Sequence, residues 1–316
     1  GYSTSDGVIL SAGFAQDNVF GSGKSVSIDV NTSKSQRTYA FSLTEPYITP
    51  EGISRNWDVY DRRVDLDELD VADVAYETIG GGISFGVPVT ESDRVFLGTR
   101  WEMTKVDLRS ASPQRYKTFV DEYGENPQSL LLTLGWSRDS RDNVLAPTRG
   151  RYQRLSGEVS VPGLDTQYYR ATYQITQYVP ITNSWTLGLN AQVGYGDTYG
   201  NDKIFPFFKN FYAGGIGSVR GYESSSLGPK DENDDNLGGT QQLVFSAELL
   251  TPLPGADRTL RGLLFLDGGN VWGYSGKTKQ STNMDLSDLR YSWGVGVAWI
   301  SPLGPLKFSI AFPLND

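Results

Sequence analysis

The sequence predicts an all-β fold, an antiparallel transmembrane β-barrel formed by residues 1–316. Three observations predict it: apolar and polar residues alternate along many short segments, short and long connections alternate along the chain, and aromatic residues (12%) and glycines (36) are abundant. Barrel strands turn apolar side chains to lipid and polar ones to the lumen, so mean hydropathy stays low; here it is −0.37. No segment has the roughly 18 to 20 consecutive apolar residues that a spanning helix needs.

The chain contains no cysteine and no histidine. Their absence removes the usual ligands of zinc sites, the Ser-His-Asp and Cys-His nucleophiles and any disulfide framework. We therefore expect no enzymatic activity, no metal and no cofactor. The net charge of −9, without a cluster of Lys and Arg, also argues against a nucleic-acid partner.

Alternation is clearest in residues 185–195, where Trp185, Leu187 and Leu189 share one face with further apolar residues and Thr186 and Asn190 lie on the other. A period of two is typical of a strand with one apolar and one polar face. The same period recurs from end to end of the chain. The complete strands predicted from it are residues 7–17, 24–33, 36–45, 53–66, 76–88, 94–108, 129–139, 150–162, 167–180, 185–197, 241–251, 259–272, 290–301 and 305–313.

The connections between these strands fall into two alternating sets. One set is mostly tight, with Pro, Gly, Asn and Asp at turn positions, as in 89–93, 181–184 and 302–304. The other set contains the long connections, although 163–166 is a short member; the long ones are 109–128, 198–240 and 273–289. Short turns at one end and long loops at the other are typical of outer-membrane barrels, whereas a soluble sandwich has no reason to separate its loops in this way.

Aromatic residues cluster near the predicted strand ends, where girdles at the two membrane interfaces would place them. The alternative is that they form the core of a soluble sandwich. The polar faces argue against it, because Arg, Glu, Gln and Thr cannot fill an apolar interior, so water or a plug must lie inside. The predicted girdle residues are Tyr47, Trp101, Trp136, Tyr178, Trp185, Trp272 and Trp299.

Two further features lie in loops. Residues 112–123 place Tyr116, Phe119 and Tyr123 at helical spacing, which predicts a short amphipathic helix that either meets a partner or packs on its own loop. Two acidic runs lack the spacing of a calcium-binding EF-hand and are expected to be solvated. They are Asp65, Asp67, Glu68, Asp70 and Asp73, and Asp231, Glu232, Asp234 and Asp235.

The segment 198–240 is too long for an ordinary hairpin connection. Its centre reads Gly214-Gly215-Ile216-Gly217-Ser218-Val219-Arg220-Gly221-Tyr222, with one arginine among glycines. Loops of this length are usually functional or disordered, and this placement of glycine and aromatic residues is not that of a low-complexity linker.

This segment, with Pro206–Tyr212 before it and Ser226–Pro229 after it, resembles the large-loop motif of the BamA family, the barrel-assembly proteins of Gram-negative outer membranes. The resemblance covers essentially the whole chain, and it implies a sixteen-strand barrel from a Gram-negative proteobacterium, with the large loop folded into the lumen. Further stretches that carry it are Gln16-Asp17-Asn18, Gly21-Ser22-Gly23, Thr44-Glu45-Pro46-Tyr47, Pro147-Thr148-Arg149-Gly150, Ala247–Pro252, Asp267–Trp272 and Ser301–Leu306.

The resemblance also implies a site. In the family the loop arginine pairs with acidic residues of the inner wall, and the matching residues here are the loop motif Val219-Arg220-Gly221-Tyr222 and the carboxylates Glu248 and Asp267. Alternation places Glu248 on the polar face of its strand, and a buried guanidinium without a partner is costly. The residues alone leave open that Arg220 is solvated and that both carboxylates line a wet pore.

The function implied by the resemblance is the folding and insertion of β-barrel proteins into the outer membrane through a lateral seam, by membrane thinning and by edge pairing with an incoming strand. The expected partners are outer-membrane lipid and lipopolysaccharide, nascent outer-membrane barrel proteins and accessory assembly lipoproteins, and the expected location is the cell outer membrane. The alternative is a related two-partner-secretion-type translocation pore that exports an extended polypeptide. A passive diffusion porin fits less well, because it would not need the arginine loop.

The ends of the chain depart from the family pattern. Residues 1–4 match only the end of the family's first barrel strand, and the chain ends after the fifteenth. We therefore expect about 14 complete strands, with the first strand truncated, the last strand missing and the periplasmic repeat domains absent.

Overall fold

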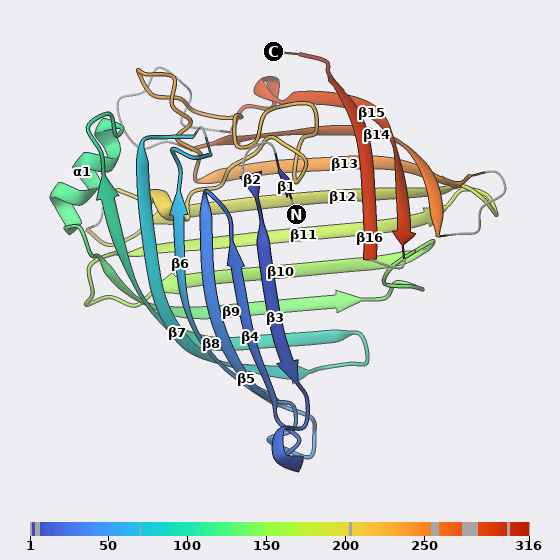
Figure 1. Ribbon diagram of the computed structural model, residues 1–316, viewed down its shortest axis with the longest axis horizontal. Coiled ribbons are helices and arrows are strands. Elements are labelled where there is room, and N and C mark those ends of the chain that lie inside the picture. Colours follow the sequence, from blue (N-terminus) through green and yellow to red (C-terminus); the bar gives the residue numbers. More distant parts are fainter. Residues whose placement is uncertain are drawn as a thin grey trace.

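The computed structural model describes residues 2–3, 7–69, 71–201, 204–253, 259–273, 284–301 and 304–315. They form one 14-stranded antiparallel sheet in which every strand pairs with its neighbours in sequence, and Figure 1 shows this sheet curling around an interior. Within the described residues β3 and β16, the two edge strands, do not pair with each other. The predicted fold of 14 antiparallel strands is confirmed.

The 14 strands follow the predicted segments closely. Their bounds are β3 (Leu10–Gln16), β4 (Ser25–Thr32), β5 (Gln36–Glu45), β6 (Ser54–Asp65), β7 (Val74–Pro88), β8 (Asp93–Leu108), β9 (Gln128–Asp139), β10 (Gly150–Ser160), β11 (Tyr168–Pro180), β12 (Thr186–Thr198), β13 (Gln241–Pro252), β14 (Leu260–Trp272), β15 (Arg290–Ser301) and β16 (Gly304–Pro313). Outside the sheet are β1 (Tyr2–Ser3), β2 (Gly7–Val8), helix α1 (Gln114–Tyr123) and the 3₁₀ turns η1 (Val19–Gly21), η2 (Phe207–Lys209) and η3 (Leu286–Asp288).

The two faces of the sheet differ as the alternation predicts. Along β12, Leu189, Val193 and Tyr195 are exposed, whereas Thr186 and Gly194 on the opposite face are buried. Neighbouring strands repeat this pattern in register, so exposed apolar side chains form a belt around the outside, as lipid-facing strands require. Members of the belt include Phe41, Trp57, Leu97, Trp101, Leu132, Leu134, Trp293, Val295 and Trp299.

The long connections lie together at one end of the sheet. The end that carries residues 109–127, with α1, also carries residues 199–240, and in Figure 1 α1 stands at the left with the loops above the sheet. The turns at the opposite end, such as 89–92 and 181–185, are short. In the part of the chain that the structure describes, no helix is both long and apolar enough to cross a membrane.

Helix α1 confirms the predicted helix and settles what it contacts. Tyr116 and Phe119, both fully buried, face the large loop. The ring of Tyr116 stacks on Phe207 with 4.1 Å between centroids, and Phe119 meets Phe207 edge-on at 5.6 Å. The helix therefore packs on the large loop between β12 and β13, and not only on its own connection as one of the two predicted possibilities had it.

The predicted strand 7–17 is wrong in its first part. Residues Gly7–Val8 form β2 and pair with β1, and the large sheet begins at Leu10. The reason is register: Leu10 lies opposite Thr32, where β4 ends, and Gly7 and Val8 pair with β1 instead.

The predicted aromatic girdle is correct in part and wrong for two residues. Tyr47, Trp101, Trp185 and Trp299 are exposed, and Trp136 is half-buried. Trp272, however, is buried, because residues entering β13 cross this end of β14, where Thr240 N donates to Gly273 O at 3.0 Å. Tyr178 faces the interior and packs against a buried cluster made by Leu250, Leu263 and Phe265.

The acidic run near residue 65 is not simply solvated. Arg109 lies 2.7 Å from Asp65, 2.8 Å from Asp67 and 3.5 Å from Asp73, so three carboxylates share one guanidinium. Asp70 lies outside the described residues. Within those residues neither acidic run forms a cluster of His, Cys, Asp or Glu that could hold a metal ion.

The turn between β9 and β10 is organised by the carboxylate of Asp142. Its oxygens accept hydrogen bonds from Thr148 Oγ1 at 2.5 Å, Thr148 N at 2.9 Å and Arg149 N at 3.2 Å. Burial would raise the pKa of Asp142, but these hydrogen bonds outweigh it and lower the pKa from 3.8 to about 2. Hydrogen bonds to the charged form favour that form.

Acidification is therefore expected to loosen this turn. Because the pKa of Asp142 is depressed in the folded protein, its stabilising contribution is complete above about pH 4 and is lost as the pH falls toward 2. Amide hydrogen exchange of Thr148 and Arg149, corrected for the intrinsic rate, should speed up across this window. In Asp142→Asn the protection should already be low at pH 5 and change little on acidification; an Asn variant that keeps the wild-type profile would contradict the assignment.

Candidate functional site

The connection between β12 and β13 folds onto the inner face of the sheet and builds its own core. Two backbone hydrogen bonds, of 2.7 and 2.9 Å, join Phe211 to Gly239, and Asn210 Nδ2 donates to Leu237 O at 2.8 Å. On the wall, Gln242 Nε2 donates to Tyr212 O at 2.8 Å. The buried apolar residues of the loop are Phe205, Phe207, Phe211, Ala213, Val219, Leu227 and Leu237.

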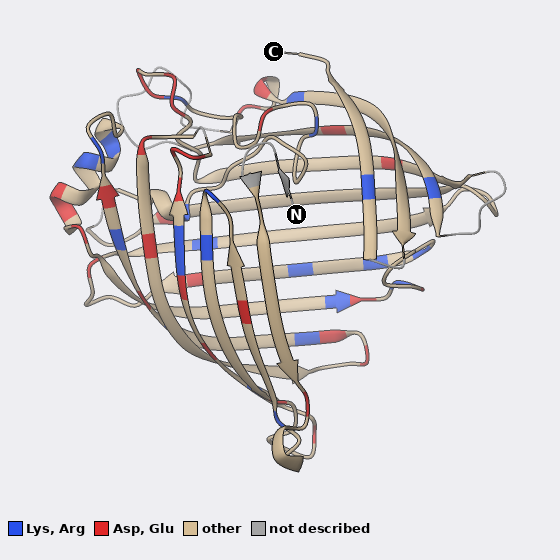
Figure 2. Ribbon diagram, in the orientation of Figure 1, with Lys and Arg blue, Asp and Glu red and all other residues tan. Residues whose placement is uncertain are grey.

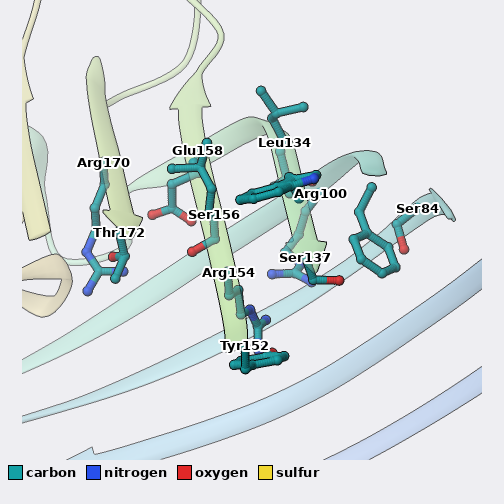
Figure 3. Close-up of a pocket in the computed structure, with 16 residues that line it drawn as sticks. Ser84, Arg100, Leu134, Ser137, Tyr152, Arg154, Ser156, Glu158, Arg170 and Thr172 are labelled. Carbon is teal, nitrogen blue, oxygen red and sulfur yellow. The ribbon is translucent and has the colours of Figure 1, made fainter. Parts of the chain in front are cut away.

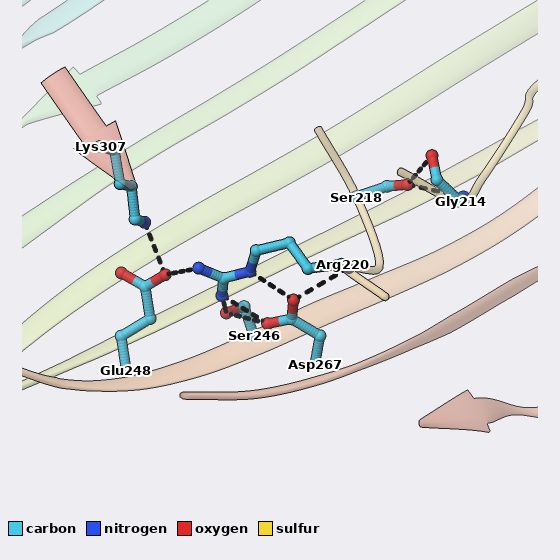
Figure 4. Close-up of polar contacts among 7 residues, drawn as sticks. All are labelled: Gly214, Ser218, Arg220, Ser246, Glu248, Asp267 and Lys307. Atoms are coloured by element: carbon cyan, nitrogen blue, oxygen red, sulfur yellow. Dashed lines mark hydrogen bonds and ion pairs between the residues drawn. The ribbon is translucent and has the colours of Figure 1, made fainter. Parts of the chain in front are cut away.

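Arg220 is surrounded by partners from β13 and β14, which Figure 4 shows converging on its guanidinium. Nε lies 2.6 Å and Nη2 2.7 Å from the two carboxylate oxygens of Asp267, and Nη1 lies 2.8 Å from Glu248. Nη2 also donates to Ser246 Oγ at 3.1 Å, and the guanidinium carbon lies 3.5 Å from the ring centroid of Phe265. The bidentate carboxylate requires the planar fork of a guanidinium, which an ammonium lacks, and the cation–π contact adds to the attraction.

Burial makes this site sensitive to the loss of either charge. Asp267 is fully buried and Arg220 is 7% exposed. The backbone N of Arg220 also donates to Asp267 at 3.2 Å, so the carboxylate holds the main chain of the loop as well as its side chain. A buried charge left without its partner is strongly destabilising, and the geometry therefore ties the position of the loop to Asp267.

Glu248 connects this site to the last strand of the sheet. The same oxygen that meets Arg220 accepts a hydrogen bond from Lys307 Nζ on β16 at 2.6 Å (Figure 4). Glu248 thus lies between a cation on the loop and a cation on β16.

The other motif residues seat the loop. Val219 is fully buried in a cluster with Phe211 and Val244. Gly221 has φ of +95°, a backbone conformation that glycine permits, and it lies against β16, where a Cβ built on it would be 3.4 Å from Ala311. The Tyr222 hydroxyl donates to Tyr291 O at 3.0 Å, and it also contacts the backbone oxygen of Asn315.

The inner wall is charged beyond this site. Figure 2 shows basic and acidic residues distributed along the strands. A cleft of about 460 Å³ opens on the inner face of β7–β11, lined by Arg100, Arg154 and Arg170 near Glu158, and Figure 3 shows the three arginine side chains projecting from three strands. The interior is therefore polar where the loop does not cover it, as the polar strand faces predict.

Sequence reasoning missed several residues of the site. Ser246 lies on the same polar strand face as Glu248, so alternation places the two side by side but does not show that Ser246 accepts a hydrogen bond from Arg220. Lys307 also falls on a polar face, but no pattern pairs it with Glu248, 59 residues away along the chain. Phe265 has no such signal: it is a large apolar residue on the inward face, and only the packed guanidinium explains it.

Replacement of Glu248 by glutamine is expected to weaken the loop anchor by about 1.5–3 kcal/mol, the usual contribution of a hydrogen bond to a charged group. The loss is partial because Arg220 keeps both contacts to Asp267. The free energy of unfolding in urea, compared with that of the exposed control Glu91→Gln, measures it. A double-mutant cycle with Arg220→Ala that gives no coupling energy would refute the pair.

Known proteins resemble this chain over almost its whole length. Residues 18–316 match the Omp85 superfamily domain. The chain is 40% identical to the outer membrane protein assembly factor BamA of Neisseria meningitidis, in an alignment covering 100% of the chain and 44% of that relative. It is 28% identical to the protein of the same name from Nitratidesulfovibrio vulgaris, covering 100% of the chain and 38% of the relative. The chain thus spans less than half the length of these relatives.

Solved structures agree with the sequence matches. The crystal structure of BamA from Haemophilus ducreyi lacking POTRA domains 1–3 superposes with a TM-score of 0.91 at 26% identity, covering 100% of this chain and 65% of that one. CdiB from Acinetobacter baumannii superposes with a TM-score of 0.63 at 15% identity, covering 99% of this chain and 54% of that one, which shows a similar fold alone. The resemblance to the BamA family read from the sequence is confirmed, and with residues 18–316 matched, the chain belongs to the Omp85 superfamily.

Proposed function

We propose that this chain is the barrel of an outer-membrane assembly factor that folds and inserts β-barrel proteins into the outer membrane through a lateral seam. The observation that carries the proposal is the full-length match to assembly factors, with 40% identity to the Neisseria protein. The apolar belt around the sheet supports a location in the membrane. Because the chain spans 44% of that relative, the activity of the whole protein is part of the proposal.

The loop motif Val219-Arg220-Gly221-Tyr222 acts in this proposal as the anchor of a lumen plug. Arg220 binds Asp267 and Glu248 on the inner wall, and Tyr222 and Gly221 meet the last two strands. The plug keeps the lumen closed to solutes while a client strand pairs at the seam. The chemistry is binding and templating, so the proposed activity is not enzymatic.

The partners in this proposal are nascent outer-membrane barrel proteins, outer-membrane lipid with lipopolysaccharide, and accessory assembly lipoproteins. Unpaired edge strands are the physical basis for templating a client by β-augmentation. The apolar belt supplies the contact with lipid acyl chains.

Depletion of the full-length protein in its own bacterium tests the function. We expect several unrelated outer-membrane barrels to lose their folded, heat-modifiable form together. If those barrels still assemble while one secreted client fails to leave the cell, the protein is a translocation pore that exports an extended polypeptide. The likeness to CdiB favours that second function only through its fold.

Single-channel conductance distinguishes a plugged barrel from a passive diffusion porin. The full-length protein in a planar bilayer is expected to remain closed for most of the recording. A large, steady conductance in the wild type would contradict the plugged lumen and favour a passive diffusion porin.

A further inference from the structure

Lys209 makes a second charged contact between the large loop and the inner wall. It ends η2 in the first half of the loop, and its Nζ lies 2.7 Å from Glu102 on β8 and 3.5 Å from Glu158 on β10. The side chains of Lys209 and Glu102 are only 16% and 7% exposed. A largely desolvated ammonium group is costly unless it is well paired, so two carboxylates from two strands form a site that matches this cation.

The wall orients both carboxylates through tyrosine hydroxyls. Tyr60 on β6 donates to Glu102 at 2.5 Å, and Tyr168 on β11 donates to Glu158 at 3.3 Å. Lys209 Nζ lies 5.8 Å from the ring centroid of Tyr168. Each carboxylate is thus held by a group outside the loop, and a cation placed between them completes the cluster.

This cluster is separate from the Arg220 site. Arg220 binds carboxylates of β13 and β14, whereas Lys209 binds carboxylates of β8 and β10, and the two sites share no residue. Between the two cations, Phe211 is fixed by its backbone hydrogen bonds to Gly239. The loop is therefore fastened at two places on the wall, one on each side of Phe211 along the chain.

We propose that Lys209 is a second positioning residue of the loop, which locks its first half to β8 and β10 whether or not Arg220 is bound. This inference rests on the plug role proposed above. With both anchors in place the lumen is closed; loss of one leaves the loop tethered by the other, and loss of both frees it to move away from the pore.

Planar-bilayer recordings of the full-length protein test this lock. Because breaking a buried ion pair is strongly destabilising, Lys209→Met is expected to raise the frequency of channel openings at least about tenfold. Lys209→Arg should stay near the wild type. The matched control is Lys230→Met in the same loop, whose lysine pairs with Asp234, a side chain that is 82% exposed. The double variant Lys209→Met with Arg220→Ala should open more often than either single variant.

A charge swap separates electrostatic positioning from lost packing. Lys209→Glu should open the channel, and adding Glu102→Lys should close it again. A Lys209→Met channel that behaves like the wild type, or a swap that conducts like Lys209→Glu alone, would overturn the proposal. If Lys209→Met does not fold, as judged by the absence of a heat-modifiable band, Glu158→Gln is recorded instead, because it leaves the Lys209–Glu102 pair intact. Its frequency of channel openings should rise by less than is expected for Lys209→Met, and a frequency equal to that of the wild type would overturn the proposal. The folding of client barrels is assayed separately. If that assay shows no assembly function but the conductance changes occur as expected, the role of Lys209 in positioning the loop is still supported.

Discussion

Replacement of Arg220 by alanine is expected to release the central part of the large loop and to destabilise the protein by about 3–5 kcal/mol, the cost of leaving a buried charge without its partner. Asp267 is fully buried and loses its two guanidinium hydrogen bonds. Glu248 keeps Lys307 and so loses less. Amide hydrogen exchange of residues 214–227 should rise by orders of magnitude, and the midpoint of urea unfolding should fall.

Arg154→Ala is the matched control for this experiment. Arg154 also faces the interior, but within the described residues it forms no ion pair with Asp267 or Glu248, and it lines the open cleft. Its replacement should leave loop exchange unchanged. Arg220→Lys should recover only part of the stability, because an ammonium group cannot bind Asp267 in a bidentate manner. If Arg220→Ala retains wild-type protection of residues 214–227, the anchor assignment is wrong.

Replacement of Phe207 by alanine is expected to separate the loop from helix α1. Phe207 is 1% exposed and contacts the rings of Tyr116, Phe119 and Tyr76. Deleting a buried phenylalanine side chain typically costs about 3–5 kcal/mol, because the transfer free energy is lost and a cavity remains. Protease cleavage within residues 109–127 should therefore become faster, since α1 loses the surface on which it packs.

The control for this prediction lies in the same loop. Ile216 is 91% exposed, so Ile216→Ala should leave the cleavage rate unchanged. Because Phe207 and Lys209 belong to the same short turn, the conductance of Phe207→Ala should also rise. Unchanged cleavage of the 109–127 segment would show that α1 is held mainly by its own strand ends.

Local pattern was sufficient for most of the sheet. The predicted strands 185–197 and 290–301 lie within one residue of the observed bounds of β12 and β15, because a strand with one face in lipid and one in a polar interior must have a period of two. The prediction failed at residues 7–8, which pair with β1 and lie beyond the end of β4. It also failed at Trp272, whose position at a strand end predicted an exposed girdle residue. Trp272 is buried because the residues entering β13 cross this end of β14.

The candidate site shows the same division. Alternation puts Glu248 on the polar face of β13, and the structure has it beside Arg220. The partners that periodicity could not supply are Lys307, 59 residues from Glu248 along the chain, and Glu102, 107 residues from Lys209. No local sequence pattern predicts either contact, because one depends on how the sheet curls and the other on where the large loop meets the inner wall.

By itself, then, the sequence determined the number and faces of the strands, the end of the sheet that carries the long loops, and the family of the chain. These follow from interactions between residues close along the chain and from the contrast between lipid and water. Only the tertiary structure decided that the large loop has a second charged contact, Lys209 with β8 and β10, beside the contacts of Arg220 with β13 and β14 that the family resemblance already implied. The physical reason is that a buried charge is satisfied by whichever opposite charge the fold brings within about 3 Å, and that choice is made in space and not along the chain.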